Sequence, residues 1–216
     1  MFDKFFLDKG LQCEYKPGEV IVDCGQTPTH VYFLESGYVK ASVLSARGNE
    51  HLLIFYKAGE IFPARWAFTH IKGSAFYTAI TSIVVRKVPK QEFTDYLLTH
   101  PHEMLQAVEY TTLIMDIFVN RVNDMAHLTA YSRLTGRLLS LVERFGKTEG
   151  AGALIELPVS HHDLAGSISM SRETVSRELR KLERKGLIEY RNQLIFVKNV
   201  SKMKSELGRI YQKNDY

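Results

Sequence analysis

Residues 160–185 read SHHDLAGSISMSRETVSRELRKLERK, and this pattern predicts two helices joined by a short turn. Ser160 and Ser171 stand where the two helices begin, because a serine side chain accepts a hydrogen bond from a backbone N–H that the first helical turn leaves unpaired. Gly186 follows the second helix, and glycine is common just beyond a helix C-terminus. The stretch therefore predicts a helix-turn-helix unit.

The second of these helices has two different faces. Val175, Leu179 and Leu182 recur at spacings of four and three, so they share one apolar face. An arginine matches the two acceptors of guanine in the major groove, and a glutamate accepts from the cytosine amino group. A solvated helix with a Glu173–Arg177 pair would carry similar charges, but the capped helix and turn before it favour DNA recognition. The residues expected to contact DNA are Ser171, Arg172, Glu173, Ser176, Arg177 and Arg180.

Two short apolar runs follow, at residues 187–190 and 194–197, with a turn between them. Two helices and such a hairpin make a winged helix-turn-helix. The stretch MSRETVSRELRKLERKGLIEY, residues 170–190, closely resembles the DNA-binding domain of the Crp/Fnr transcription regulators, and a weaker resemblance extends over almost the whole chain. The resemblance implies a homodimer that binds double-stranded DNA and contacts RNA polymerase.

The base contacts expected from this resemblance define a half-site. Glu173 and Arg177 lie four residues apart and are expected to read one G·C pair together. Arg172 matches the cyclic-AMP receptor branch of the family, whereas Ser176 matches the Fnr branch. We expect an inverted repeat with a TGA core in each half-site, either TGTGA or TTGAT, with the first favoured.

Charge is distributed unevenly along the chain. Residues 1–130 hold 12 Lys/Arg and 14 Asp/Glu, a net charge of −2, whereas residues 131–216 hold 16 and 10, a net charge of +6. A basic C-terminal half suits contact with DNA phosphates. The chain lacks a run of about 18 apolar residues that would span a membrane, and its N-terminus does not read as a secretory signal. A cytoplasmic protein without membrane contact is expected.

Residues 11–89 are expected to be mainly β-structure, because short apolar runs alternate there with Gly and Pro. These runs resemble the cyclic-nucleotide-binding type of β-roll. We therefore expect an α+β protein with a β-roll sensor domain over residues 1–100. A dimerisation helix and hinge over residues 101–130 and a winged helix-turn-helix DNA-binding domain over residues 131–216 would follow.

The helix expected from His102 to about Leu128 carries a heptad seam. Such a seam buries its side chains against a second helix, as the dimerisation helix of the family does. A single helix packed on its own roll is the alternative. A second apolar edge that includes Ile114, Phe118 and Met125 suggests that both apply. The seam residues are Leu105, Val108, Thr112, Met115, Val119, Val122 and Ala126.

Residues 58–66 occupy the place of the family's phosphate-binding cassette. Family members that bind cyclic nucleotides carry a Gly-Glu pair for the ribose and an Arg-Ser pair for the phosphate, but this chain has Pro63-Ala64 and Gly73-Ser74. Cyclic AMP is therefore not the expected ligand. A small aromatic or carboxylated effector and an ordinary aromatic core are the two alternatives. The expected effector pocket comprises Phe62, Arg65, Trp66, Phe76 and Phe118.

The sequence does not predict a cofactor, a metal site or an enzyme. Cys13 and Cys24 are the two cysteines, too few for a four-cysteine iron–sulfur cluster. A redox disulfide between them and two small buried side chains remain alternatives. A cupin-type barrel enzyme would need clustered histidine and carboxylate ligands, and a regulator with a closed, ligand-independent roll is a further alternative.

Overall fold

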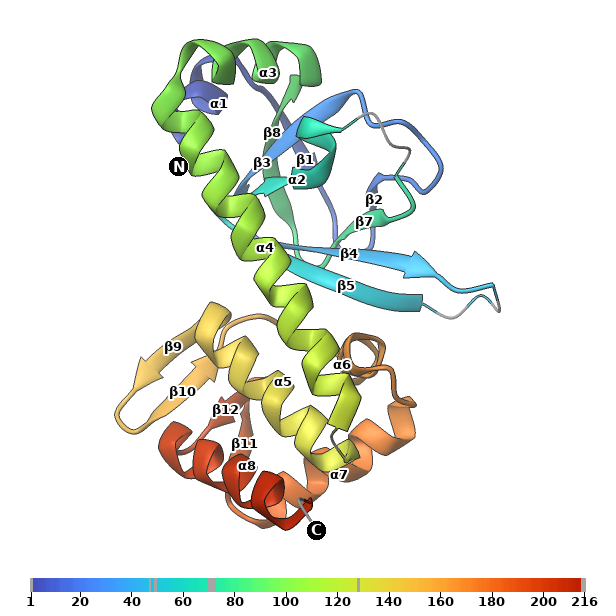
Figure 1. Ribbon diagram of the computed structural model, residues 1–216, viewed down its shortest axis with the longest axis vertical. Coiled ribbons are helices and arrows are strands. Elements are labelled where there is room, and N and C mark those ends of the chain that lie inside the picture. Colours follow the sequence, from blue (N-terminus) through green and yellow to red (C-terminus); the bar gives the residue numbers. More distant parts are fainter. Residues whose placement is uncertain (1, 47, 49, 70–72, 128, 215–216) are drawn as a thin grey trace. The chain divides into compact units, whose positions relative to one another are not determined.

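A computed structural model describes residues 2–46, 48, 50–69, 73–127 and 129–214, with the backbone alone at residues 64, 67, 123, 124, 126, 127 and 209–214. The chain divides into two compact units, residues 1–117 and 118–216, and each is described by itself (Figure 1). One unit is rich in strands and the other is mainly helical, which confirms the expected α+β class.

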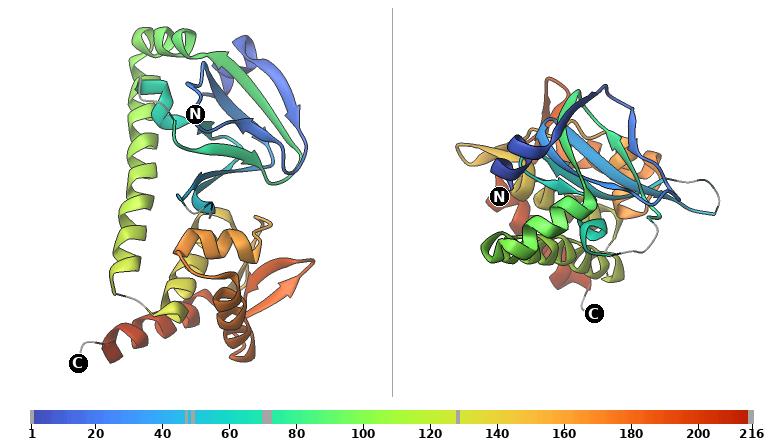
Figure 2. Two further views of the ribbon diagram at one scale, coloured as in Figure 1. Left: turned by 90° about the vertical axis from the view of Figure 1, so that its right-hand side faces the viewer. Right: turned by 90° about the horizontal axis from the view of Figure 1, so that it is seen from above.

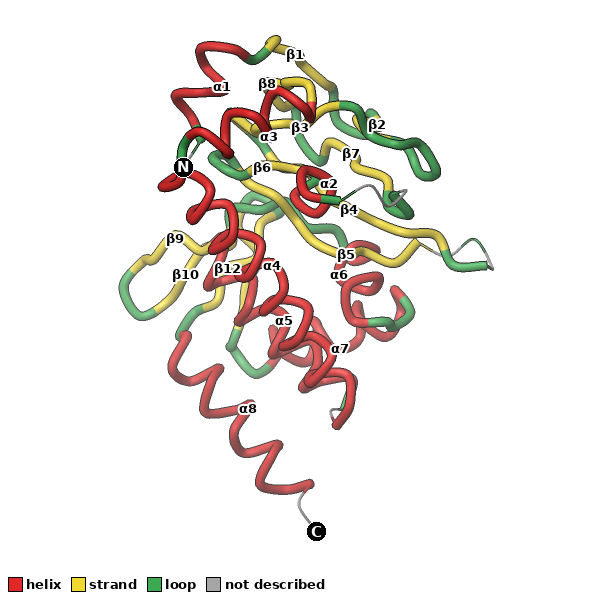
Figure 3. The backbone as a smooth tube through the Cα atoms, turned by 45° about the horizontal axis from the view of Figure 1, so that its top comes forward, coloured by secondary structure: helices red, strands yellow, loops and turns green. Residues whose placement is uncertain are grey.

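The N-terminal unit is built on two four-stranded antiparallel sheets, drawn in yellow in Figure 3. The first has the strand order β1 (Leu11–Tyr15), β8 (Ile83–Pro89), β3 (His30–Ser36), β6 (Ile61–Phe62). The second has the order β2 (Val20–Val22), β7 (Phe76–Ala79), β4 (Tyr38–Leu44), β5 (Glu50–Lys57). The helices of this region are α1 (Asp3–Lys9), α2 (Ala64–Phe68), α3 (Lys90–Thr99) and α4 (Pro101–His127), and the last of these continues into the second unit.

Aromatic side chains join the helices of this unit to the first sheet. Phe6 of α1 stacks on Phe33 of β3 with ring centroids 5.4 Å apart, and Phe5 stacks on Tyr96 of α3 at 4.1 Å. Tyr110 of α4 donates its hydroxyl to the backbone carbonyl of Ile61 at 3.1 Å. The N-terminal segment does not read as a secretory signal, and its apolar residues form a helix that completes this core.

Gly37 allows β3 and β4 to turn sharply into one another. Its φ of +84° lies in the left-handed region that favours glycine. A Cβ added there would lie 2.5 Å from the carbonyl oxygen of Ser82. The backbone at residue 37 can therefore approach the Ser82 carbonyl this closely only because glycine has no side chain.

The C-terminal unit contains a four-stranded antiparallel sheet and four complete helices among its described residues. The sheet has the order β11 (Ile188–Arg191), β12 (Leu194–Val197), β10 (Gly152–Ile155), β9 (Gly146–Glu149). The helices are α5 (Ala130–Phe145), α6 (His161–Ile168), α7 (Arg172–Arg184) and α8 (Val200–Asn214).

Two of these elements differ from the sequence expectation. The sequence predicts only a helix end and a glycine-rich turn at residues 146–152, yet pairing with β10 makes the exposed residues of β9 a strand. The sequence predicts a last short helix over residues 200–208, yet α8 continues to Asn214. Thr129, expected to be a hinge residue, caps α5 by accepting a hydrogen bond from the backbone N–H of Ser132.

Candidate nucleic-acid interface

Side-chain caps define the start of both helices in the helix-turn-helix. Ser160 accepts from the backbone N–H of Asp163 at 3.0 Å, and Asp163 accepts in return from the backbone N–H of Ser160 at 3.3 Å. Ser171 accepts from the backbone N–H of Thr174 at 3.2 Å. Between them, Ser169 adopts a left-handed conformation with φ +54° and ends α6. These local contacts place α7 at a defined angle after α6.

The apolar face of α7 anchors it in the C-terminal unit. Val175, Leu179 and Leu182 are each at most 1% exposed, which confirms the apolar face expected from the sequence. On the other side, the side chains of Arg172, Glu173, Arg177 and Arg180 are exposed, and that of Ser176 is half-buried. Figure 2 shows α7 beside the hairpin of β11 and β12.

Glu173 lies in the first turn of α7. Its carboxylate accepts hydrogen bonds from its own backbone N–H and from the Ser171 hydroxyl, and both contacts lower its pKa. The positive end of the helix dipole favours the same ionised form. Glu173 is thus a hydrogen-bond acceptor at neutral pH, as a contact to a cytosine amino group requires.

Arg177 is held by a neighbour that sequence reasoning did not identify. Its Nε donates to Oε1 of Glu178 at 3.1 Å, instead of forming the Glu173 pair considered from the sequence. The Glu178 side chain is only 3% exposed, whereas Arg177 is 61% exposed. Lys181 Nζ donates to both Glu178 oxygens, at 2.9 and 2.8 Å. Burial acts to raise the pKa of Glu178, but the hydrogen bonds from Lys181 and Arg177 outweigh it and the pKa is lowered.

Ser176 is held by a second residue that the sequence did not single out. Its hydroxyl oxygen lies 2.9 Å from Nδ1 of His161, and Nε2 of the same ring lies 3.1 Å from the Tyr190 hydroxyl of β11. His161 is the first residue of α6. Burial lowers its pKa, and the charges of Arg172 and Arg180 lower it further. The sequence contains no local signal for this contact, because the partners are 15 and 29 residues away.

The expected dimer seam lies on an exposed face of α4. Its described side chains are all exposed, and the apolar ones range from 48% at Val119 to 66% at Met115. The face that packs on the first sheet carries Ala107 and Tyr110, with Ile114 partly buried against the same core. Of the second apolar edge, Met125 instead contacts the Ser169 hydroxyl through its sulfur at 3.7 Å. The side chain of Ala126 lies outside the described part of the structure.

The expected effector residues are distributed between several environments. Phe62 is buried and stacks between Tyr32 and Tyr77, with ring centroids 5.3 and 5.6 Å away. Trp66 is also buried, with Nζ of Lys90 5.5 Å from its ring centroid. Phe76 is half-buried, and Phe118 is half-buried on the part of α4 that belongs to the C-terminal unit.

Arg65 is exposed on α2, as expected if the aromatic residues are an ordinary core with this arginine on the surface. Its charge nevertheless acts on the Tyr77 hydroxyl. Burial raises the pKa of Tyr77 to about 12, while a hydrogen bond from Tyr56 and the charge of Arg65 act in the opposite direction. The hydroxyl-bearing rings of the buried Tyr56 and the half-buried Tyr77 lie beside Phe62 of the expected pocket, and the sequence had not singled out Tyr56.

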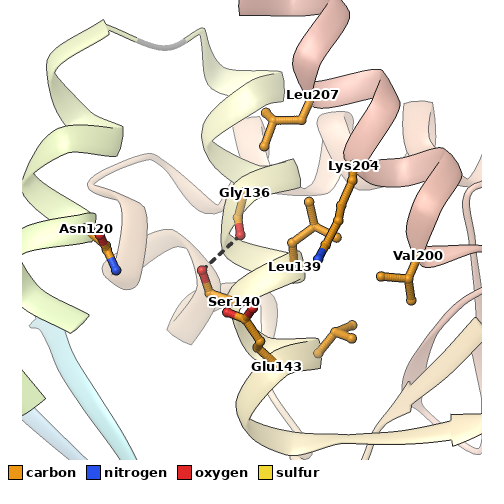
Figure 4. Close-up of a pocket in the computed structure, with 9 residues that line it drawn as sticks. Asn120, Gly136, Leu139, Ser140, Glu143, Val200, Lys204 and Leu207 are labelled. Carbon is orange, nitrogen blue, oxygen red and sulfur yellow. Dashed lines mark hydrogen bonds between the residues drawn. The ribbon is translucent and has the colours of Figure 1, made fainter. Parts of the chain in front are cut away.

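Two hollows in the described structure lie away from these aromatics. One of about 310 Å³ is lined by α4, α5 and α8, with Leu139, Val142, Val200 and Leu207 among its apolar residues (Figure 4). The other, of about 370 Å³, lies beside β1 and β8 of the N-terminal unit. Neither includes a residue from the expected effector pocket.

The two cysteines lie in different environments. Both cysteines are free; Cys13 is half-buried in β1, and Cys24 is exposed in a turn after β2, so the pair is not two buried side chains. In the described regions, His, Cys, Asp and Glu side chains do not form a group of three suited to a metal ion. Each described helix is too short or too polar to cross a membrane.

Known proteins share both the sequence patterns and the fold. A model of the Crp-like helix-turn-helix domain matches residues 132–206, and a model of the cyclic nucleotide-binding domain matches residues 12–100. The global nitrogen regulator of Synechococcus elongatus is 28% identical over 191 residues, covering 86% of this chain and 85% of that protein. The nitrogen fixation regulation protein FixK of Rhizobium meliloti is 27% identical over 186 residues, covering 84% and 80%. The structure of FixK2 from Bradyrhizobium japonicum matches with a TM-score of 0.79 at 19% identity, covering 91% of this chain and 96% of that chain, a likeness of fold alone.

Proposed function

Because this chain belongs to the Crp/Fnr family of transcription regulators, we propose that it acts as a homodimer on an inverted-repeat DNA operator. The observation that carries the proposal is the exposed polar face of α7, with Arg177 61% exposed at its middle. The buried face of the same helix keeps this side chain at a fixed place on the surface. RNA polymerase is the partner expected from the family, and the cytoplasm is the expected location.

The base contacts proposed for α7 follow from its donors and acceptors. Arg177 donates to guanine and Glu173 accepts from the paired cytosine, which gives the core G·C pair of a TGA-containing half-site. Because Glu178 takes the Nε of Arg177, the two terminal nitrogens are the donors assigned to guanine O6 and N7. Arg172 and Ser176 contact the outer positions of the half-site, and Ser171 and Arg180 complete the DNA-facing set.

Selection of bound DNA from a random pool tests this proposal. Single-base variants of the selected operator are then titrated at fixed salt with the wild type and Arg177→Ala. We expect the wild type to prefer the core G·C pair by about 5- to 150-fold, because one bidentate pair discriminates by ~1–3 kcal/mol, and Arg177→Ala to lose that preference. Full discrimination by Arg177→Ala would contradict the recognition scheme.

Arg184→Ala is the matched control for this titration. Arg184 is exposed on the same helix near its C-terminus, so its loss should weaken binding to all sequences alike. Lys185, the next residue along the chain, is unsuitable as a control. It pairs with Glu206 and lies 4.6 Å from the ring centroid of Tyr131, so its removal would also disturb the fold.

The N-terminal roll is proposed to respond to a small effector that is not a cyclic nucleotide. Pro63-Ala64 and Gly73-Ser74 supply neither a ribose-binding carboxylate nor a phosphate-binding cation. An unpaired phosphate beside Phe62 and Tyr77 would be costly to desolvate. Operator affinity should therefore be the same with and without cyclic AMP, while the small-molecule fraction of a cell extract should change it.

A closed roll without an effector is the second candidate for this unit. The stacked rings of Tyr32 and Phe62 in one sheet and Tyr77 in the other connect the two sheets where an effector would bind, and they favour this candidate. Full operator affinity of the purified protein, unchanged by any extract fraction, would select this candidate. A dissociation constant for cyclic AMP in the micromolar range would contradict both.

A further inference from the structure

His161 connects three elements of the C-terminal unit through one imidazole ring. It begins α6, its Nδ1 lies 2.9 Å from the Ser176 hydroxyl oxygen in α7, and its Nε2 lies 3.1 Å from the Tyr190 hydroxyl in β11. All three side chains belong to the helix-turn-helix and its wing. The contact therefore joins a residue proposed to face a base to a titratable group beside it.

The chemistry of a hydroxyl makes this contact directional. A serine hydroxyl has one hydrogen to donate and also accepts, and a neutral imidazole has one donor and one acceptor nitrogen. If Nδ1 donates to Ser176, the serine hydrogen is available for an acceptor such as thymine O4. If Nδ1 accepts from Ser176, the serine oxygen is left to accept from the amino group of adenine or cytosine.

We propose that His161 is a positioning residue that sets the base preference of Ser176 by orienting its hydroxyl. The proposal rests on the proposed function, because it requires Ser176 to face a base pair of the operator. A protonated imidazole donates from both nitrogens. Protonation therefore leaves Ser176 to accept from His161, turns its hydrogen toward DNA and favours thymine at that position.

The groups around the ring decide when this protonation occurs. Burial holds the pKa of His161 below its ordinary value, and the charges of Arg172 and Arg180 of α7 lower it further. From β11, Tyr190 is a neutral partner whose own pKa is raised by burial and then by Glu183. DNA phosphates would offset the two arginine charges, so the bound ring takes up a proton more readily than the free one. Thymine preference should therefore rise as pH falls.

The experiment compares operators that differ only at the base pair assigned to Ser176, from about pH 5.5 to about pH 8, where histidine titrates. In the wild type, the preference for thymine should change by about three- to tenfold over this range, the effect of about one hydrogen bond. His161→Phe and Ser176→Ala should each remove that change. The double variant should behave as Ser176→Ala alone does.

Two controls separate positioning from a structural role. Discrimination at the core G·C pair assigned to Arg177 should be unaffected by His161→Phe, and the exposed neighbour variant His162→Phe should retain the wild-type pH dependence. If His161→Phe fails to fold, as judged by thermal unfolding, His161→Gln replaces it. Gln does not titrate and should likewise show no pH dependence.

The outcomes distinguish this inference from the proposed function. If the pH-dependent thymine preference persists in His161→Phe, the role of His161 is overturned. It is also overturned if His161→Phe loses base discrimination equally at every position. A wild type that lacks any preference at the core G·C pair overturns the proposed function itself. If the preference at the core G·C pair is retained but the preference at the position assigned to Ser176 does not depend on His161, only the role of His161 is overturned.

Discussion

Replacing Val119 and Val122 of α4 by glutamate should convert the proposed homodimer into monomers. The two side chains are 48% and 61% exposed in the single chain, so roughly half of each remains to be buried by a partner. Complete burial of a valine side chain contributes about 2 kcal/mol, so each contributes about 1 kcal/mol on dimerisation. Four valines in the two copies then contribute about 4 kcal/mol, or about a thousandfold in the dissociation constant.

The substitution should leave the single chain folded, because the opposite face of α4 carries its packing. Ala107 and Tyr110 are buried there and are unchanged in the variant. Sedimentation over a range of protein concentrations measures the dimer dissociation constant, and far-ultraviolet circular dichroism checks the fold. Glutamate adds a desolvation cost to the lost apolar burial, so a thousandfold weakening is a lower estimate.

Leu113→Glu is the matched control for the seam. Leu113 is 53% exposed on the same helix but lies one position beyond the seam residue Thr112, on a different face. It should leave the dimer intact. A Val119→Glu, Val122→Glu variant that dimerises within about tenfold of the wild type, or that binds operator tightly as a verified monomer, would refute the assigned interface.

Three further perturbations test the structure itself. Glu178→Gln leaves Arg177 and Lys181 without their buried carboxylate and should lower the free energy of unfolding by about 1–3 kcal/mol in urea, whereas the exposed Glu183→Gln should change it by less than about 0.5 kcal/mol. Gly59→Ala should lower the free energy of unfolding by about 1–2 kcal/mol, because its φ is +87° with open space around it. Gly37→Ala should lower it clearly more, since the added Cβ also meets the Ser82 carbonyl oxygen. Equal losses would contradict the close approach of residue 37 to that carbonyl. Burial lowers the pKa of His161 in the folded state, so the unfolded chain binds more protons at acid pH. The stability that the neutral ring contributes is therefore present above about pH 6.5 and is lost as the pH falls. His161→Phe should reduce this acid destabilisation in calorimetry, and an unchanged pH profile would contradict the burial of the ring.

Sequence determined the elements whose causes are local. Ser160 and Ser171 cap helices through contacts only three residues away, and Val175, Leu179 and Leu182 share a face because of helical spacing. The same holds for the glycine-punctuated strands of the roll. Periodicity and capping depend only on residues that are close in the sequence, so the α+β class and the helix-turn-helix could be predicted from the sequence alone.

Tertiary structure decided which polar groups have hydrogen-bond partners. From the sequence, Glu178 is indistinguishable from the exposed charged residues of α7. In the structure it is buried, and its carboxylate accepts from both Arg177 and Lys181. Ser176 reads as a free hydroxyl, but the folding of α6 and β11 around α7 brings His161 and Tyr190 to it. β9 likewise becomes a strand only through its ladder with β10. Ser176 and Tyr190 lie 15 and 29 residues from His161, and a hydrogen bond between such segments leaves no periodicity in either one, so only the folded chain reveals it. Glu178 and β9 have partners close in the chain, but the burial of Glu178 and the ladder of β9 form only when the chain folds.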